Sequence, residues 1–140
     1  MGHKDELLRR SDIVTLHIPL TMDTVNFISA REMSWMKPSA VLVNTARGAI
    51  VNEADLMQAL ARKTIRAAAM DVFQEEPYHG ELCGLPNVLL TCHMGSMTAD
   101  CRARMELEAT REAIRFLKGE PLASPVPPEE FEIAASFARR

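Results

Sequence analysis

The chain has 140 residues, of which 47% are hydrophobic and 25% charged, and its formal net charge is −3. This composition excludes an intrinsically disordered chain, and the length suits one domain that buries a core without disulfides or structural metals. The acidic balance and the lack of any long basic run argue against a nucleic-acid partner. No apolar stretch approaches the roughly 20 residues that cross a membrane, and no signal segment opens the chain. We therefore expect a cytoplasmic globular protein.

The three cysteines are Cys83, Cys92 and Cys101, spaced nine residues apart. An odd number excludes a closed disulfide framework, and the spacing lacks the C-x-x-C pairs that are typical of zinc sites. We expect reduced, partly buried thiols and no bound metal.

The first half of the chain alternates between apolar runs and a helical pattern. Residues 12–18 are rich in Ile and Val and predict a buried strand. Ser29 and Glu32 have the spacing of a capping box, which predicts a helix over residues 30–36. A second apolar run predicts a strand over residues 40–44.

The second half continues this alternation. Asn52 is expected to cap a helix over residues 53–63. Strands are predicted near 66–71 and 88–91, and a long helix near 99–118. Continuous apolar strands that alternate with helices indicate an α/β fold with a parallel sheet covered on both faces.

Polar residues follow each predicted strand, where parallel strands of α/β proteins present their ligand sites. His17 ends the first strand, Arg47 follows the second, Asp71 and Glu76 follow the third, and His93 follows the fourth. Each of them alone is more often a surface group. Together on successive strand ends, an Arg, an acid and a His favour a functional site.

Four longer segments then carry a specific resemblance: residues 36–38, 43–51, 71–77 and 87–96. In this order they resemble the D-isomer-specific 2-hydroxyacid dehydrogenases, and most of all the phosphoglycerate, glyoxylate and hydroxypyruvate members. The resemblance covers roughly residues 7 to 125. It implies that residues 1–120 form the second half of a Rossmann-type NAD-binding domain. Residues 121–140 would be the return segment, with four prolines and a short helix over 129–138.

The resemblance implies three catalytic residues. Arg47 matches the arginine that binds the substrate, and a guanidinium can hold the carboxylate of a 2-oxo acid with two hydrogen bonds. His93 matches the general acid/base, which protonates the carbonyl oxygen during reduction and removes the hydroxyl proton in reverse. Glu76 matches the carboxylate that pairs with this imidazole and orients it.

The resemblance also implies an NAD site. Asp71 matches the residue that meets the nicotinamide carboxamide, which can donate to a carboxylate. NADP remains open, because the family's ribose-binding acid has no counterpart in the chain. The full set of cofactor-binding positions implied is Ile18, Pro19, Thr45, Ala46, Arg47, Asp71, His93, Gly95 and Ser96.

The chain departs from the family pattern in two ways. It has no G-x-G-x-x-G loop, which in the family binds the pyrophosphate of the cofactor. Cys92 stands where the family usually has proline. We therefore interpret the chain as a dehydrogenase fragment that is inactive alone. The alternative is a non-catalytic half-domain that serves as an oligomerisation or interaction module. In either case we expect a homo-oligomer, because the strand at 12–18 would lack a neighbour along one edge.

Overall fold

The computed structural model describes residues 3–127. These residues belong to two compact units, with the boundary between His93 and Met94. The first unit contains three α-helices, two short 3-10 helices and all four strands, and the second contains one long helix. None of the helices described is long and apolar enough to cross a membrane. The domain boundary that we expect at residue 120 stays a prediction.

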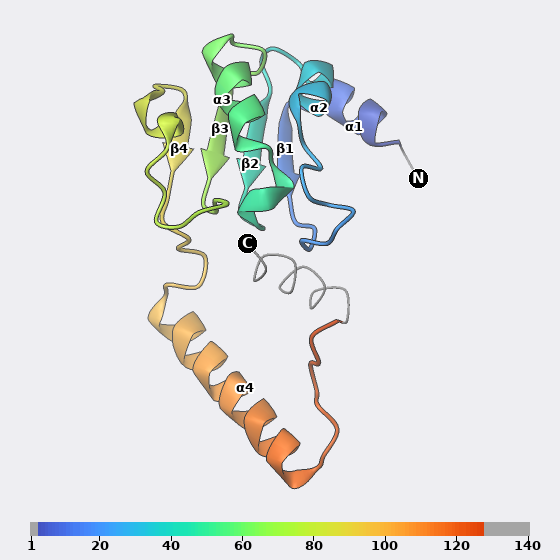
Figure 1. Ribbon diagram of the computed structural model, residues 1–140, viewed down its shortest axis with the longest axis vertical. Helices are drawn as coiled ribbons and strands as arrows, with labels where there is room; N and C mark the ends of the chain where they lie inside the picture. Colours follow the sequence, from blue (N-terminus) through green and yellow to red (C-terminus); the bar gives the residue numbers. More distant parts are fainter. Residues whose placement is uncertain (1–2, 128–140) are drawn as a thin grey trace. The chain divides into compact units, whose positions relative to one another are not determined.

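The four predicted strands form one parallel sheet in the order β1-β2-β3-β4, which confirms the α/β fold class (Figure 1). Each strand is one to three residues shorter than its predicted run. The strand bounds are β1 Ile13–Leu16, β2 Val41–Asn44, β3 Ala67–Met70 and β4 Val88–Leu90. Because the strands are parallel and follow one another in chain order, all four carboxyl ends lie at the same edge of the sheet.

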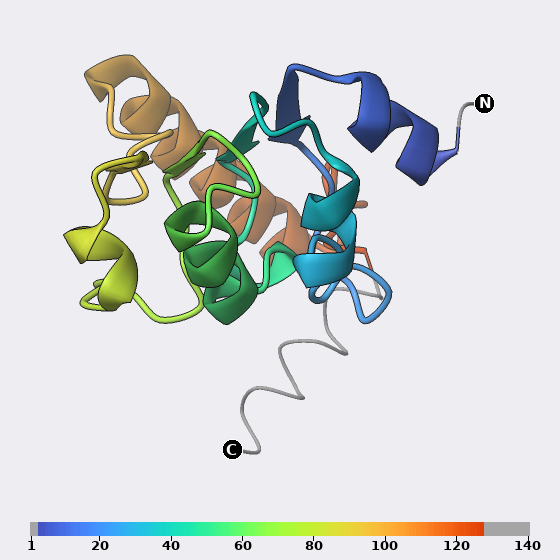
Figure 2. The same cartoon turned by 90° about the horizontal axis from the view of Figure 1, so that it is seen from above.

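The helices predicted between the strands are present as α2 (Ala30–Trp35) and α3 (Glu53–Ala61). Both lie on the same side of the sheet in Figures 1 and 2. This follows from the topology, because successive right-handed crossovers that step in one direction place their helices on one face. The buried core combines the inner side of these helices with alternate strand residues, among them Leu42 and Met70, which are at most 1% exposed.

Within this unit the helices α2 and α3 cover one face of the sheet, and the covering of the second face stays a prediction. Residues of β1 are alternately exposed and buried, and Ile13 is 66% exposed. On the edge strand at the other side, Leu89 is 63% exposed. A continuous apolar run predicts a fully buried strand, but burial of the second face needs covering elements that successive crossovers in one direction do not supply.

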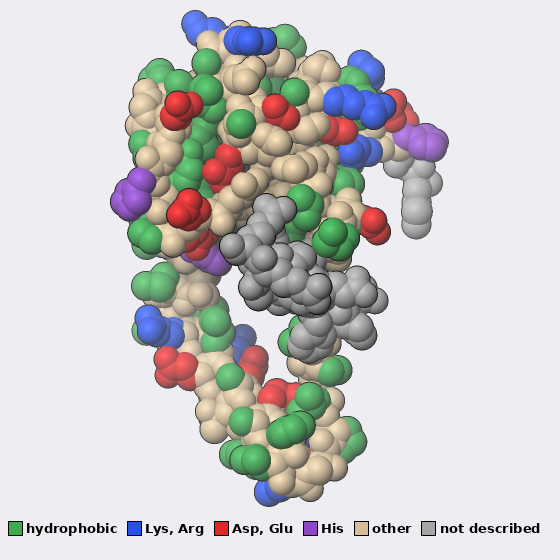
Figure 3. Space-filling view, in the orientation of Figure 1, with side chains coloured by type: hydrophobic (Ala, Val, Ile, Leu, Met, Phe, Trp, Pro, Cys, Tyr) green, Lys and Arg blue, Asp and Glu red, His purple; other side chains and the backbone are tan. Residues whose placement is uncertain are grey.

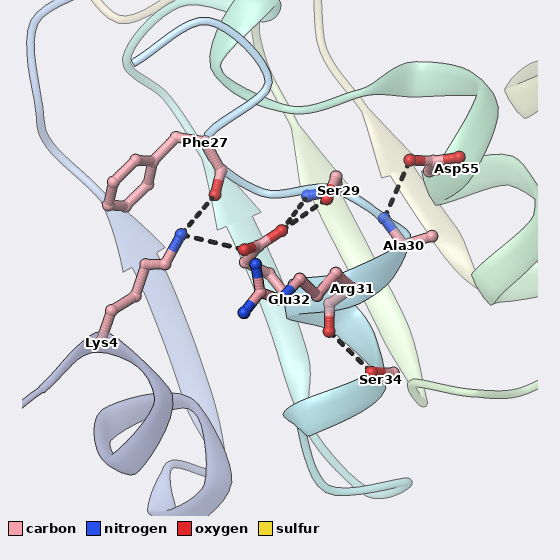
Figure 4. A network of polar contacts seen from close by, with 8 residues as sticks. All are labelled: Lys4, Phe27, Ser29, Ala30, Arg31, Glu32, Ser34 and Asp55. Carbon is pink, nitrogen blue, oxygen red and sulfur yellow. Dashed lines mark hydrogen bonds and ion pairs between the residues drawn. The ribbon is translucent and has the colours of Figure 1, made fainter. Parts of the chain in front are cut away.

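A helix that the sequence analysis did not predict, α1 (Lys4–Arg10), lies next to α2. Figure 4 shows how it is tied to the rest of the unit. Lys4 Nζ donates to Glu32 Oε1 at 3.0 Å and to the carbonyl of Phe27 at 3.2 Å. Glu32 in turn accepts from the Ser29 backbone N–H at 3.1 Å, as the capping box predicts, and in addition from the Ser29 hydroxyl. The cap of α2 is therefore also the attachment point of α1.

The start of α3 is capped as predicted, since Asn52 Oδ1 accepts from the Asp55 N–H at 3.0 Å. Asp55 Oδ2 accepts from the Ala30 N–H at 2.9 Å, so the first turns of α2 and α3 are joined directly (Figure 4). Lys and Arg side chains gather at the upper end of this unit in Figure 3, which is the amino-terminal end of the strands.

The second unit contains α4 (Ala99–Lys118), which confirms the predicted long helix. Thr98 Oγ1 accepts from the Cys101 N–H at 3.3 Å and caps its start. Gly119 ends it with a φ of 71°, a left-handed conformation that glycine adopts without a Cβ penalty. Glu112 accepts hydrogen bonds from the Ala123 and Ser124 N–H groups, which folds the following segment against the helix. The helix predicted over 129–138 lies outside the described residues.

Candidate active site

The loop that carries Arg47 is held by a buried asparagine at the end of β2. Asn44 is 0% exposed. Its Oδ1 accepts from the Ala46 N–H at 3.1 Å, and its Nδ2 donates to the Arg47 carbonyl at 2.9 Å. The Arg47 side chain itself is exposed, and its guanidinium donates to the Ala46 carbonyl at 2.7 Å. The sequence analysis missed this role of Asn44, although a polar residue at the end of an apolar strand was a visible signal.

Gly48, the first residue of the 3-10 helix η1 (Gly48–Ile50), lets this loop approach the loop after β3. A Cβ at position 48 would lie 1.9 Å from the carbonyl carbon of Phe73 and 2.2 Å from its oxygen. These are backbone atoms, so no side-chain rotation could relieve the clash. Only glycine therefore permits this contact between the Arg47 loop and the segment that leads to Glu76.

Asp71 connects the ends of three strands. Its N–H donates to the Asn44 carbonyl at 3.0 Å, and its own carbonyl accepts from the His93 N–H at 2.8 Å. Its Oδ1 accepts a short hydrogen bond from the Thr91 hydroxyl. The carboxylate is thus oriented by the residue that follows β4, and the Asp71 backbone links the segments that follow β2 and β4.

Glu76 and His93 form the predicted pair. Glu76 Oε2 lies 2.9 Å from His93 Nδ1, and Glu76 Oε1 accepts from the Phe73 N–H at 3.0 Å. The hydrogen bond with His93, followed by that from Phe73, lowers the pKa of Glu76 below its ordinary value. The pair is partly open to solvent, with side chains 37% and 48% exposed. An imidazole oriented through Nδ1 by an ionised carboxylate is suited to transfer a proton at its other nitrogen.

The structure thus joins Glu76 to His93 and places Arg47 after the strand next to that of Asp71. Among residues 3–127 it shows no hydrogen bond from Arg47 to either member of the pair. Their roles in catalysis stay predictions.

The NAD-binding domain of the D-isomer specific 2-hydroxyacid dehydrogenases matches residues 1–95, which is more than half of the chain. The chain belongs to this family. The matched part of this family is its NAD-binding domain. Residues 1–95 of the chain, which match it, contain all three predicted catalytic residues.

Individual relatives agree with this assignment. The chain is 44% identical over 117 residues to a glyoxylate reductase of Thermococcus litoralis, with 83% of this chain and 35% of the relative covered. It is similar in structure to a glyoxylate reductase from Paecilomyes thermophila, with a TM-score of 0.83 and 35% identity over 90% of this chain and 39% of that one. It is also similar to a D-lactate dehydrogenase of Lactobacillus jensenii solved with NAD+, with a TM-score of 0.77 and 29% identity over 90% and 42% of the two chains. The chain thus spans about a third of the length of the glyoxylate reductase of Thermococcus litoralis.

The chemistry of the first unit's rim suits a nicotinamide. The Asp71 carboxylate, oriented by Thr91, is an acceptor of the kind that a carboxamide N–H requires. Ile18 and Ala46 are half-buried apolar groups, and Pro19 and Thr45 beside them are exposed. The two remaining predicted cofactor residues, Gly95 and Ser96, belong to the second unit.

Proposed function

We propose that this chain supplies the catalytic residues of an NAD-dependent dehydrogenase that interconverts a small 2-oxo acid and the corresponding 2-hydroxy acid. The observation that carries the proposal is the contact of 2.9 Å between Glu76 and His93 within the segment that matches the family. Arg47 follows the neighbouring strand β2, in a loop fixed by Asn44. NAD(H), when bound, supplies the hydride chemistry.

Each of the three residues has a separate task in this proposal. Arg47 holds the substrate carboxylate through charge-assisted hydrogen bonds. His93 donates a proton to the carbonyl oxygen as the substrate is reduced, and takes the hydroxyl proton in the reverse direction. Glu76 keeps the imidazole in one orientation. The lowered pKa of Glu76 supports this task, because its main cause is the hydrogen bond that holds the ionised carboxylate against the imidazole.

Cofactor binding is expected to be weak in this chain by itself. The printed sequence has no G-x-G-x-x-G loop, and backbone amides of such a loop at a helix N-terminus provide a large part of pyrophosphate binding. We therefore propose that turnover needs a second polypeptide segment that brings this loop.

NADH fluorescence titration tests the proposal, first with the purified chain and then after co-expression with the complementary part of a glyoxylate reductase. We expect weak binding by the chain alone, and tighter binding with turnover of glyoxylate or hydroxypyruvate by the complemented form. His93→Ala should remove most turnover, and Arg47→Ala should in addition weaken oxo-acid binding. Neither binding nor turnover in the complemented form would favour the non-catalytic interaction module instead.

We further propose that the chain self-associates. Among the described strands, β1 has a neighbour on one side only, so half of its backbone groups are left without a sheet partner. Ile13 of this strand is 66% exposed, which adds an apolar surface to the open edge. Sedimentation at micromolar concentration should therefore show a dimer or a larger assembly. A monomer over the whole concentration range would refute this part of the proposal.

A further inference from the structure

A cavity of about 600 Å³ lies directly beside the Glu76–His93 pair, within the first unit. Its size falls in the range of small-molecule pockets, which are mostly apolar with a few polar groups that fix the ligand. It is lined by Phe73, Glu76, Pro77, Tyr78, His79, Cys83, Leu90, Thr91, Cys92 and His93. The catalytic pair thus forms part of its wall.

The remainder of the wall is mainly apolar. The rings of Phe73 and Tyr78 are stacked, with their centroids 4.3 Å apart. Leu90 is half-buried, and the thiols of Cys83 and Cys92 are exposed. These groups offer an organic ligand apolar contact rather than hydrogen bonds.

The polar groups of the wall are largely satisfied within the protein. Both carboxylate oxygens of Glu76 accept hydrogen bonds, one from His93 and one from the Phe73 N–H. The Thr91 hydroxyl donates to Asp71. A polar ligand group placed deep in this cavity would therefore lose its water contacts without gaining many partners, whereas an apolar group would gain from the transfer.

A second hollow of about 500 Å³ lies next to it but has the wrong charge for an anionic substrate. Its lining includes Glu53, Glu75 and Glu81. Carboxylates at these positions would repel the carboxylate of an oxo acid. Of these two hollows, the cavity at the catalytic pair is the one that combines an apolar wall with the proton-transfer group.

We propose that the side chain of the substrate 2-oxo acid occupies the cavity beside His93, so that the site favours oxo acids with branched apolar or aromatic side chains over two- and three-carbon acids. This inference rests on the proposed function, since it assumes that the substrate carbonyl binds at His93. Glyoxylate has no side chain, and pyruvate has only a methyl group, so neither could fill a cavity of this size.

The two thiols provide a direct test on the unmodified chain. The rate of alkylation by N-ethylmaleimide is measured for each cysteine by mass spectrometry, with and without NAD+, at increasing concentrations of 4-methyl-2-oxopentanoate, phenylpyruvate or pyruvate. Occupancy of the cavity should protect Cys83 and Cys92, whereas Cys101 on α4 lies outside the lining and is the internal control. The three extra carbons of 4-methyl-2-oxopentanoate should lower the half-protecting concentration at least about tenfold relative to pyruvate.

A cavity-filling variant tests the same inference independently. Cys83→Phe should abolish the advantage of the two bulky acids over pyruvate, with the binding of all three acids followed by competition or calorimetry. Cys101→Phe adds the same side chain outside the cavity and should leave the preference intact. Circular dichroism confirms that each variant is folded. If Cys83→Phe does not fold, the protection measurement on the unmodified chain decides alone.

Failure of this inference is distinguishable from failure of the proposed function. Turnover of glyoxylate by the complemented chain without protection of Cys83 and Cys92 by either bulky acid would overturn the cavity assignment alone. Equal protection by pyruvate and the bulky acids would also overturn it. Protection by the bulky acids in a chain that shows neither NADH binding nor turnover after complementation would support the cavity and overturn the dehydrogenase proposal.

Discussion

Replacing the buried glutamate of the α2 cap should destabilise the protein in a strongly pH-dependent way. Glu32 is 6% exposed and is contacted by Lys4 and Ser29 (Figure 4). Burial alone would raise the pKa of Glu32, but the hydrogen bonds from Ser29 and Lys4 outweigh it and lower the pKa from 4.5 to about 2. The ionised carboxylate is thus the form that the folded state prefers.

The magnitude follows from this difference. A pKa unit corresponds to about 1.4 kcal/mol, so a decrease from 4.5 to about 2 contributes up to about 3 kcal/mol to the free energy of unfolding at neutral pH. Because the folded pKa lies below the unfolded one, this contribution is complete above pH 4.5 and is lost as the pH falls towards 2. Glu32→Gln should therefore cost about 2 to 3 kcal/mol at pH 7 and almost nothing near pH 2.

Urea unfolding followed by the fluorescence of Trp35, the one tryptophan of the chain, measures this difference. Glu6→Gln is the matched control. Glu6 pairs with Arg10 at the same distance of 3.0 Å as Glu32 with Lys4, but both side chains are more than half exposed. An exposed pair of this kind contributes about 0.3 to 0.5 kcal/mol. An equal decrease in the free energy of unfolding in the two variants would refute the reasoning. So would a decrease in Glu32→Gln that is the same at pH 7 as near pH 2.

Two further predictions concern the active site. Gly48→Ala should destabilise the protein by about 3 kcal/mol or more, since its Cβ would overlap backbone atoms, whereas Gly84→Ala, which meets nothing within 4 Å, should stay within about 0.5 kcal/mol in the same urea assay. A similar effect of the two substitutions would contradict the close approach at position 48. His93→Ala should raise the pKa of Glu76 towards its ordinary value, because the hydrogen bond with His93 is the main cause of its lowering. His79→Ala should leave that pKa in place. NMR titration of the Glu76 carboxyl carbon distinguishes these outcomes, and an unchanged midpoint in His93→Ala would show that another group holds it low.

Local sequence patterns were sufficient for the four strands and for the helices α2, α3 and α4. Apolar runs four to seven residues long marked the four strands, and side-chain caps at Ser29 and Asn52 marked the starts of α2 and α3. These signals are local, because a cap involves residues three positions apart and a strand is read from its own side chains. The pairing of Glu76 with His93 was also predicted, but from family resemblance and from the rule that parallel strand ends share one edge.

Contacts between distant segments could not be predicted in the same way. Helix α1 contains acidic residues in its first turn and basic ones in its last, yet seven residues are too few to form a stable helix alone. Its stability depends on the contact of Lys4 with Glu32, 28 residues away. The position of α2 and α3 on one face of the sheet is likewise set by the crossovers and not by the strands themselves.

The sequence by itself thus determined the order and type of the main elements, the family and the candidate catalytic residues, because these depend on local patterns and matched motifs. The tertiary structure alone decided how the site is held and what surrounds it. Asn44 fixes the Arg47 loop, Gly48 allows that loop to meet Phe73, and a cavity lies beside His93. The last two depend on the packing of loops that are separated along the chain, and neither hydrophobic periodicity nor motif spacing encodes the distance between such loops.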